Sequence, residues 1–323
     1  MTSTAFLRKI TDLTANNTPF LFLVDFEKQF PQVYTWEEAA QQGLYFSVNG
    51  ISNVEEKPTG EINPHLISYP IEKNRYGKAF RQVVKELQQG NSFLLNLTFP
   101  TEIEIKASLS DLFFHTKASY KLFKKDAFTV FSPECFIKIK DGFVYTYPMK
   151  GTVDASLPNA QELLHNNPKE TFEHNTIVDL MRNDLSQIAK KVTVTKFRYA
   201  ETLTTAQGDL LQTSSEIRGE LQPNWRENLG ELLLNLLPAG SVSGAPKAKT
   251  CDIIKANEVG PRGYYTGVFG VFDGTNLDSG VMIRYIEQKN GRTYFRSGGG
   301  ITALSNETEE YAELLKKIYL PLF

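Results

Sequence analysis

Lys150 and Glu134 are the two residues whose types and positions most directly suggest chemistry. They flank two alternating polar and apolar runs, which an Asp-Gly pair at positions 141–142 joins. A two-residue Asp-Gly loop favours a type I′ β-hairpin, and extending its register outward places Glu134 opposite Met149, one residue from Lys150. Residues that face each other across two strands lie about 5 Å apart. The pattern predicts an acid beside an amine, with a salt bridge at the rim of a sheet as the ordinary alternative.

Two pairs of glutamates share one spacing. Glu170 and Glu173 lie near the start of one predicted helix, and Glu310 and Glu313 lie near the start of another. Residues three apart in a helix lie on one face, so each pair can direct two carboxylates to one place. With no His or Cys in register, four such carboxylates would select a hard, oxygen-binding ion such as Mg²⁺. Acidic residues also favour the first helical turn through the helix dipole, so helix capping is the alternative to a metal site.

The composition limits the classes of protein to consider. The chain has 323 residues, of which 41% are hydrophobic and 22% charged, as in a globular protein with a large core. A net charge of −2 gives no sign of a nucleic-acid or membrane-surface partner. The apolar run Phe20–Val24 is too short for a signal sequence or a membrane span. With only Cys135 and Cys251 available, no disulfide framework is expected, and we expect a cytoplasmic protein with reduced thiols.

Helical periodicity identifies the elements that must position these side chains. It predicts helices at about 74–89, 108–117, 168–189, 245–257 and 307–319. Asn167 is expected to cap the third of these, whose apolar stripe begins at Phe172, and Asn306 is expected to cap the last. The segment Lys57–Gly60 has the composition of an exposed loop.

Strand signals surround these helices without βαβ alternation. They include Phe20–Val24, Leu44–Val48 and a meander of three strands in the C-terminal third, predicted at Tyr265–Phe272, Gly280–Glu287 and Arg292–Ser297. The predicted fold class is therefore α+β, with largely antiparallel sheet and helices packed outside it.

Taken together, these residues resemble the chorismate-utilising enzymes, and within that family the component I branch of aminodeoxychorismate synthase. The resemblance covers roughly residues 74–323 and rests on seven blocks in chain order: Ser132–Phe136, Pro148–Thr152, Glu173–Leu185, Ser243–Lys247, Ile283-Arg284, Gly298–Ile301 and Glu310–Glu313. It implies one chorismate-binding domain over residues 1–323, with a shortened N-terminal portion at 1–70. The implied fold is a single α/β sandwich with the active site between two mostly antiparallel sheets.

The resemblance also implies a role for each candidate residue. Glu173 and Glu313 would bind Mg²⁺ directly, and Glu170 and Glu310 would support the ion through its waters. Glu134 would be the general acid that protonates the departing ring hydroxyl. The implied substrate-binding residues are Arg284, for the enolpyruvyl carboxylate, together with Thr152, Tyr265, Gly267, Gly298, Gly299 and Gly300.

Lys150 separates the branches of this family. Anthranilate synthases carry a small residue at this position, whereas the aminodeoxychorismate enzymes carry Lys, whose amine would attack the ring and must first be neutralised by desolvation. Leu94 stands where the isochorismate branch has a water-activating Lys, so water is not the expected nucleophile. The implied activity is conversion of chorismate and ammonia into 4-amino-4-deoxychorismate, for p-aminobenzoate and folate synthesis. A partner glutamine amidotransferase subunit would supply the ammonia.

Two alternative functions remain: anthranilate synthase component I and a non-catalytic chorismate-binding paralogue.

The sequence departs from the family pattern in places. Gln212 stands where many relatives have a His. His174 is expected on the surface of its helix, and a structural ion-pair set beside the site is expected from Asp179, Arg182 and Asp184.

Overall fold

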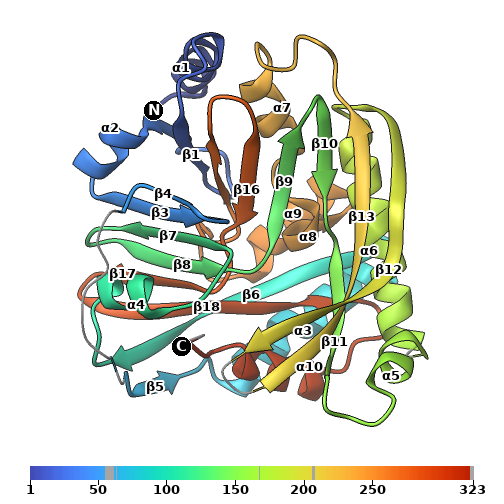
Figure 1. Cartoon of the computed structure of the whole chain (residues 1–323). Helices are drawn as coiled ribbons and strands as arrows, with labels where there is room; N and C mark the ends of the chain where they lie inside the picture. The colour runs from blue at the N-terminus through green and yellow to red at the C-terminus, as the bar shows by residue number, and fades with distance from the viewer. Residues whose placement is uncertain (55–61, 63, 167, 206–207, 321–323) are drawn as a thin grey trace.

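The computed structural model describes residues 1–54, 62, 64–166, 168–205 and 208–320. Within these residues the strands form two nine-stranded sheets, and their pairings are antiparallel. The predicted α+β class with two mostly antiparallel sheets is confirmed. Figure 1 shows the strands of one sheet running across those of the other, with helices outside both.

The first sheet holds the predicted hairpin. Its order is β11 (Met149–Asp154), β13 (Gly208–Glu220), β10 (Phe143–Thr146), β9 (Cys135–Lys140), β16 (Leu277–Val281), β15 (Val268–Phe272), β1 (Phe20–Val24) and β2 (Gln32–Thr35), and β12 (Lys190–Thr205) also pairs with β13.

The second sheet holds the glycine-rich strand. Its order is β14 (Gly244–Ala245), β6 (Leu94–Ile105), β18 (Arg292–Ile301), β17 (Tyr285–Lys289), β8 (Phe128–Ser132), β7 (Tyr120–Lys124), β3 (Leu44–Val48) and β4 (Ile51–Ser52), and β5 (Leu66–Tyr69) also pairs with β6.

Helices cover the outer faces of both sheets. Those that pack on the first sheet include α1 (Ser3–Ala15), α6 (Pro168–Ser186), α7 (Leu229–Leu236) and α8 (Gly240–Ser243). Those that pack on the second sheet include α3 (Lys73–Gln88), α4 (Leu109–His115), α9 (Lys247–Asn257) and α10 (Glu307–Lys316). The remaining helices are α2 (Trp36–Gln41) and α5 (Ala160–Asn166). No helix among the described residues is long and apolar enough to cross a membrane.

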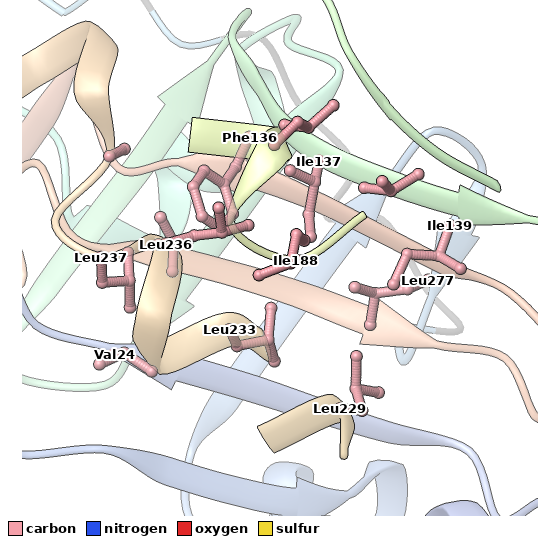
Figure 2. Packing of buried hydrophobic residues seen from close by; sticks show 14 of the residues in the cluster. Val24, Phe136, Ile137, Ile139, Ile188, Leu229, Leu233, Leu236, Leu237 and Leu277 are labelled. Carbon is pink, nitrogen blue, oxygen red and sulfur yellow. The ribbon is translucent and has the colours of Figure 1, made fainter. Parts of the chain in front are cut away.

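Strand β1 contributes side chains to two separate hydrophobic cores, one on each face of its sheet. All five of its side chains are buried, because successive residues of a strand point to opposite faces and both faces are covered. Leu21 and Leu23 belong to the core between the two sheets, whereas Phe20 and Phe22 belong to the core under the helices. Figure 2 shows this second core, in which Leu229, from α7, and strand side chains such as Ile139 take part.

The predicted helices are present with small shifts at their ends. They correspond to α3, α4, α6, α9 and α10, and Asn306 caps α10 by accepting from the backbone N–H groups of Thr308 and Glu309. The predicted cap Asn167 and the predicted loop Lys57–Gly60 lie outside the described residues.

The predicted C-terminal meander is wrong in one respect. The segment predicted as one strand, Gly280–Glu287, is divided between β16 in the first sheet and β17 in the second. The chain changes sheet through residues 282–284, where Arg284 has a positive φ of 51°. Arg284 therefore lies at the junction of the two sheets.

The hairpin prediction is confirmed at its turn and wrong at its open end. Phe143 pairs with Lys140, and Asp141 and Gly142 both have positive φ, as a type I′ turn requires. The pairing of β10 with β9 ends at Tyr145, and Met149 pairs with Ser214 of β13 instead of facing Glu134. Glu134 and Lys150 therefore do not come together through the hairpin ladder.

Candidate active site

A cavity of about 420 Å³ lies where the two sheets, α6, α8 and α10 meet. All of the predicted site residues line it except Gly267 and Gly299; those that do are Glu134, Lys150, Thr152, Glu170, Glu173, Tyr265, Arg284, Gly298, Gly300, Glu310 and Glu313. The fold thus gathers residues that are up to 179 positions apart in the sequence, from Glu134 to Glu313.

Lys150 reaches the cavity because β11 is irregular. The pairing of β11 with β13 shifts between Met149 and Thr152, and Gly151 within the shift has a φ of +80°. A β-bulge redirects side chains relative to a regular strand. The Lys150 Nζ lies 3.1 Å from Glu173 Oε2. A Cβ on Gly300 would lie 3.6 Å from the same Nζ, at van der Waals distance, so Gly300 borders the amine.

The charge state of Lys150 differs from the expectation. Burial lowers the pKa of its amine, but Glu173, with smaller effects of Glu313 and Glu170, outweighs burial and leaves the pKa above its usual value. In this arrangement the amine is held as an ammonium ion, so the expectation that desolvation alone makes it neutral is wrong.

Glu134 is placed to act as an acid. Its backbone N–H donates to Ser132 Oγ and its carbonyl accepts from the N–H of Val281, which fixes the residue just before β9. Burial raises the pKa of its carboxyl, against smaller lowering effects of the Ser241 hydrogen bond and of the nearby positive charge of Lys150. A carboxyl with a raised pKa keeps its proton to higher pH and can donate it.

Four carboxylates face the cavity from two helices. Glu170 and Glu173 come from α6, and Glu310 and Glu313 come from α10. Three of these carboxylates lie against glycines. A Cβ on Gly151 would lie 3.3 Å from a Glu170 oxygen, and a Cβ on Gly299 would lie 3.5 Å from a Glu310 oxygen and 3.4 Å from a Glu313 oxygen. The donors are all oxygens, which is the chemistry that Mg²⁺ prefers.

Two of the four carboxylates, Glu173 and Glu313, are paired with lysines in this structure. Glu173 binds Lys150, and Glu313 Oε1 lies 2.7 Å from Lys317 Nζ. In the part of the chain that the structure describes, no three acidic, His or Cys side chains are grouped closely enough to hold a metal ion. A metal at this place would therefore have to displace the two ammonium groups from Glu173 and Glu313.

Arg284 contributes a positive charge to the wall of the same cavity. Its guanidinium lies over the ring of Tyr319, 4.8 Å from the ring centroid, and burial lowers its pKa. An arginine stays protonated even so, and among the described residues it has no carboxylate partner. A cation in this state is ready to bind an anion.

The glycine-rich end of β18 borders the same region. Pairing of β18 with β17 ends at Arg296, whereas its pairing with β6 continues to Ile301. The stretch from Gly298 to Gly300 thus has one edge without a strand partner in the described sheet. Gly298 and Gly300 line the cavity, and the Gly298 carbonyl accepts from Lys317 Nζ at 2.9 Å.

Two predicted residues lie away from the cavity wall. A Cβ on Gly267 would lie 2.3 Å from the Val24 carbonyl oxygen, so this glycine permits close packing against β1. Gly299 does not line the cavity, although it lies behind Glu310 and Glu313.

Ser241 and Lys317 are site residues that sequence reasoning missed. Ser241, in the short helix α8, donates a hydrogen bond to Glu134 Oε1. Lys317 contacts both Glu313 and Gly298. Lys317 stands one turn after Glu313, a spacing that could have indicated an ion pair; Ser241 gave no signal of its own.

The predicted surroundings of α6 need two corrections. His174 is 1% exposed, not on the surface, and its Nε2 hydrogen-bonds Ser215 Oγ at 2.7 Å. Burial, with a smaller effect of Arg198, lowers its pKa to about 4, so it is neutral at neutral pH. The predicted ion-pair set is divided, because Arg182 binds Asp179 whereas Asp184 binds Lys247 of α9.

Gln212 does line the cavity, as its place in the family pattern suggested. Its side-chain Oε1 is buried and has no hydrogen-bond partner within the described residues. The amide is therefore free to accept from a bound molecule.

Comparison with known proteins identifies the family. The profile of the chorismate binding enzymes matches residues 5–322 of the chain. The chain belongs to the chorismate-binding enzyme family. Among its relatives, an uncharacterised PabA-like protein of Pasteurella multocida is 52% identical over 319 residues, which covers 98% of both chains. An uncharacterised PabA-like protein of Haemophilus influenzae is 50% identical over 317 residues, covering 98% of this chain and 96% of that protein.

More distant members of the chorismate-binding family have named activities. Aminodeoxychorismate synthase component 1 of Salmonella typhimurium is 30% identical over 329 residues, covering 96% of this chain and 69% of that protein. The structure of anthranilate synthase component I from Streptococcus pneumoniae has a TM-score of 0.68 at 27% identity, over 79% of this chain and 58% of that one. The Escherichia coli isochorismate synthase MenF has a TM-score of 0.73 at 16% identity, over 97% of this chain and 80% of that one, and so shares the fold.

Proposed function

We propose that this chorismate-binding protein is an aminodeoxychorismate synthase component I, which forms 4-amino-4-deoxychorismate from chorismate and ammonia. The observation that carries the proposal is the presence of an amine and a carboxyl with a raised pKa, Lys150 and Glu134, in the wall of one cavity. Arg284 in the same wall supplies a cation for a carboxylate of the substrate. An acid, a nucleophile and an anion-binding group are the three parts that this reaction needs.

The proposed reaction has two displacement steps. The lone pair of neutral Lys150 Nζ forms a bond to ring C2, both ring double bonds shift by one position, and the C4–O bond breaks. Glu134 gives its proton to the departing oxygen, which leaves as water. Ammonia then forms a bond to C4, both double bonds shift back, and the C2–N bond to Lys150 breaks. The sum is chorismate plus ammonia giving aminodeoxychorismate plus water, with each proton lost by nitrogen restoring Glu134 or Lys150.

Leu94 supports ammonia over water as the final nucleophile. Its Cδ1 lies 3.3 Å from the ideal Cβ position of Gly300, and Lys150 Nζ lies 3.6 Å from the same point. Leu94 and the amine thus both border Gly300, and the apolar side chain offers no group to deprotonate water. Ammonia carries its own lone pair and needs no such base.

The oxygen donors of this site suit Mg²⁺ in their chemistry, although among the described residues they are not grouped closely enough to hold the ion in this arrangement. We propose Glu173 and Glu313 as its ligands, with Glu170 and Glu310 in support. When bound, the ion would supply positive charge for the ring carboxylate of chorismate. The same carboxylates also control the protonation state of the Lys150 amine. Because Glu173 holds its amine as an ammonium ion, the carboxylates must be drawn away from Lys150 before the amine can attack.

The nitrogen is proposed to come from a separate glutamine amidotransferase. Cys135 is buried, and burial raises the pKa of its thiol to about 12, so it is a poor nucleophile. Burial also raises the pKa of the Cys251 thiol, which lies within α9. Neither cysteine suits glutamine hydrolysis.

The test is incubation of the purified chain with chorismate, MgCl₂ and an ammonium salt, with products separated by chromatography. Aminodeoxychorismate is the expected product from the wild type and from the control Lys191→Ala, which alters an exposed ion pair with Glu220. It should be missing with Lys150→Ala. Anthranilate as the main product of the wild type would assign the chain to the anthranilate synthase activity instead. No consumption of chorismate by folded protein would refute the enzymatic proposal.

A further inference from the structure

Arg296 is a buried arginine in the cavity wall for which neither the sequence motifs nor the proposed reaction provides a role. It lies in β18, is 7% exposed, and lines the cavity together with Arg284. Its Nη1 donates to Glu287 Oε1 at 3.1 Å, and its guanidinium carbon lies 5.1 Å from the ring centroid of Tyr265. These contacts fix the guanidinium but do not use all of its donors.

Among the residues that the structure describes, none accepts from the Nε–H of Arg296. It is buried and lacks a hydrogen-bond partner within the described residues. Buried donors are almost always satisfied in folded proteins, and a charged donor without a partner is especially unfavourable. A molecule that enters the cavity with an acceptor would remove this deficit.

A second buried arginine in the same chain gives a direct comparison. Arg262 is 2% exposed, and its Nε, Nη1 and Nη2 donate to Glu258, to the carbonyl of Val242 and to the carbonyl of Asn96. Every guanidinium nitrogen of Arg262 thus has an acceptor, as in a structural residue. Arg296, in the wall of the cavity, differs in that its Nε–H has none within the described residues.

Strand register brings the two guanidinium-bearing residues close together. Tyr285 of β17 pairs with Arg296 of β18, so Arg284 is one residue from the position directly across from Arg296. Both residues line the cavity. Arg296 has Glu287 as a carboxylate partner, whereas none of the ion pairs among the described residues includes Arg284. The acidic side chains Glu170, Glu173, Glu310 and Glu313 come instead from α6 and α10.

We infer that Arg296 and Arg284 form a two-guanidinium subsite that binds one carboxylate of a small dianionic substrate, with the Nε–H of Arg296 as a donor to that carboxylate. The inference rests on the proposed function for the identity of the substrate, and it adds Arg296 as a substrate-binding residue. A planar carboxylate accepts well from guanidinium N–H groups in a fork. Tyr265 assists by holding the Arg296 guanidinium with its ring face.

Arg296→Lys isolates the proposed donor. A lysine keeps the positive charge and can still reach Glu287, but it has no Nε–H and no planar fork. Two matched controls separate binding from structure. Glu287→Gln removes the negative charge beside Arg296 but keeps an oxygen that can accept from its Nη1, so the guanidinium stays held. Arg292→Gln changes an exposed arginine of the same strand that pairs with Glu102.

Binding of chorismate in the presence of MgCl₂ and without ammonium should be measured by isothermal titration calorimetry, and KM and kcat should be measured with ammonium. Arg296→Lys is expected to raise Kd and KM for chorismate at least tenfold while kcat changes less than threefold. Both controls are expected to stay within twofold of the wild type.

Two results would overturn the inference alone: a wild-type Kd in Arg296→Lys, or an equal loss of affinity in Glu287→Gln, which would give Arg296 a structural role. If the wild type itself bound no chorismate, the proposed function would fail, and the inference with it. A variant that failed to fold would be recognised by circular dichroism. Arg296→Gln, which keeps a donor and the approximate length but loses the charge, would then be measured, with the same tenfold criterion.

Discussion

Glu134→Gln is expected to abolish most turnover while making the fold more stable at neutral pH. A general acid contributes about 10²–10⁴-fold to rate, which at about 1.36 kcal/mol per tenfold is about 3–5 kcal/mol of transition-state stabilisation. Glutamine keeps the shape of the side chain and an oxygen that can accept from Ser241 Oγ, but it has no acidic proton. The loss should therefore appear in kcat for aminodeoxychorismate, measured at saturating chorismate.

The stability gain follows from the sign of the pKa shift. Burial raises the folded-state pKa of Glu134, whereas in the unfolded chain a glutamate titrates near pH ~4.3. The folded protein thus binds this proton more tightly, and its stability falls as pH rises from the unfolded pKa through the raised folded pKa. Glutamine does not titrate. The advantage of the variant should be absent near pH 4 and present near pH 8, as measured by urea unfolding at both values.

Glu220→Gln provides the matched control. Glu220 is a strand glutamate whose pKa is lowered by its hydrogen bond and ion pair with Lys191, so its contribution to stability has the opposite sign. This control should retain full turnover and should gain no stability at pH 8. Wild-type kcat in Glu134→Gln would refute the acid role. The same stability change at pH 4 and pH 8 would refute the burial argument.

Four further predictions concern the same cavity. Lys150→Ala should abolish or severely reduce aminodeoxychorismate formation, as followed by chromatography, and a wild-type rate would exclude the covalent step. Glu173→Gln and Glu313→Gln should each lower Mg²⁺-dependent turnover by at least ~100-fold, the upper end of what loss of an outer-sphere partner costs; full activity of the wild type in chelator would return both acidic pairs to helix capping. Ser241→Ala removes one hydrogen bond to Glu134, worth about 1–1.5 kcal/mol, so kcat should fall by roughly 5–13-fold. Because that hydrogen bond lowers the pKa of Glu134, the alkaline limb of the pH–rate profile should move to higher pH in the variant. The purified chain should use ammonium salts but not glutamine, and its rate should rise above neutral pH as NH₃ replaces NH₄⁺; robust turnover with glutamine alone would reveal a nitrogen-releasing site in this chain.

Local signals in the sequence predicted local structure well. The Asp141-Gly142 turn fixes the pairing of Phe143 with Lys140 because these two residues directly flank the turn. Beyond Thr146 the partner changes to β13, which lies more than 60 residues further along the chain. A hairpin rule cannot detect that competing strand. The predicted register was therefore wrong, and Lys150 lines the cavity through its place in β11.

The exposed face of α6 was mispredicted for a similar reason. The sequence places Phe172 in the apolar stripe and His174 on the surface, whereas Phe172 is 61% exposed and His174 is buried. The helix packs against β11, β12 and β13, and Ser215 of β13 supplies a hydroxyl for the imidazole. A polar residue can be buried when another segment satisfies it, and helical periodicity alone contains no information on that partner.

The wide separation of the paired segments along the chain has a consequence for how the protein folds. Strands β6 and β18 pair over nine residues although about 200 residues lie between them, and the hydrogen bond between Ser241 and Glu134 joins residues 107 positions apart. Contacts of this kind must close long loops first, so folds that depend on them form slowly. The cavity should consequently be among the last features to appear, and partly folded chains, even with much of their secondary structure in place, should have no affinity for the substrate.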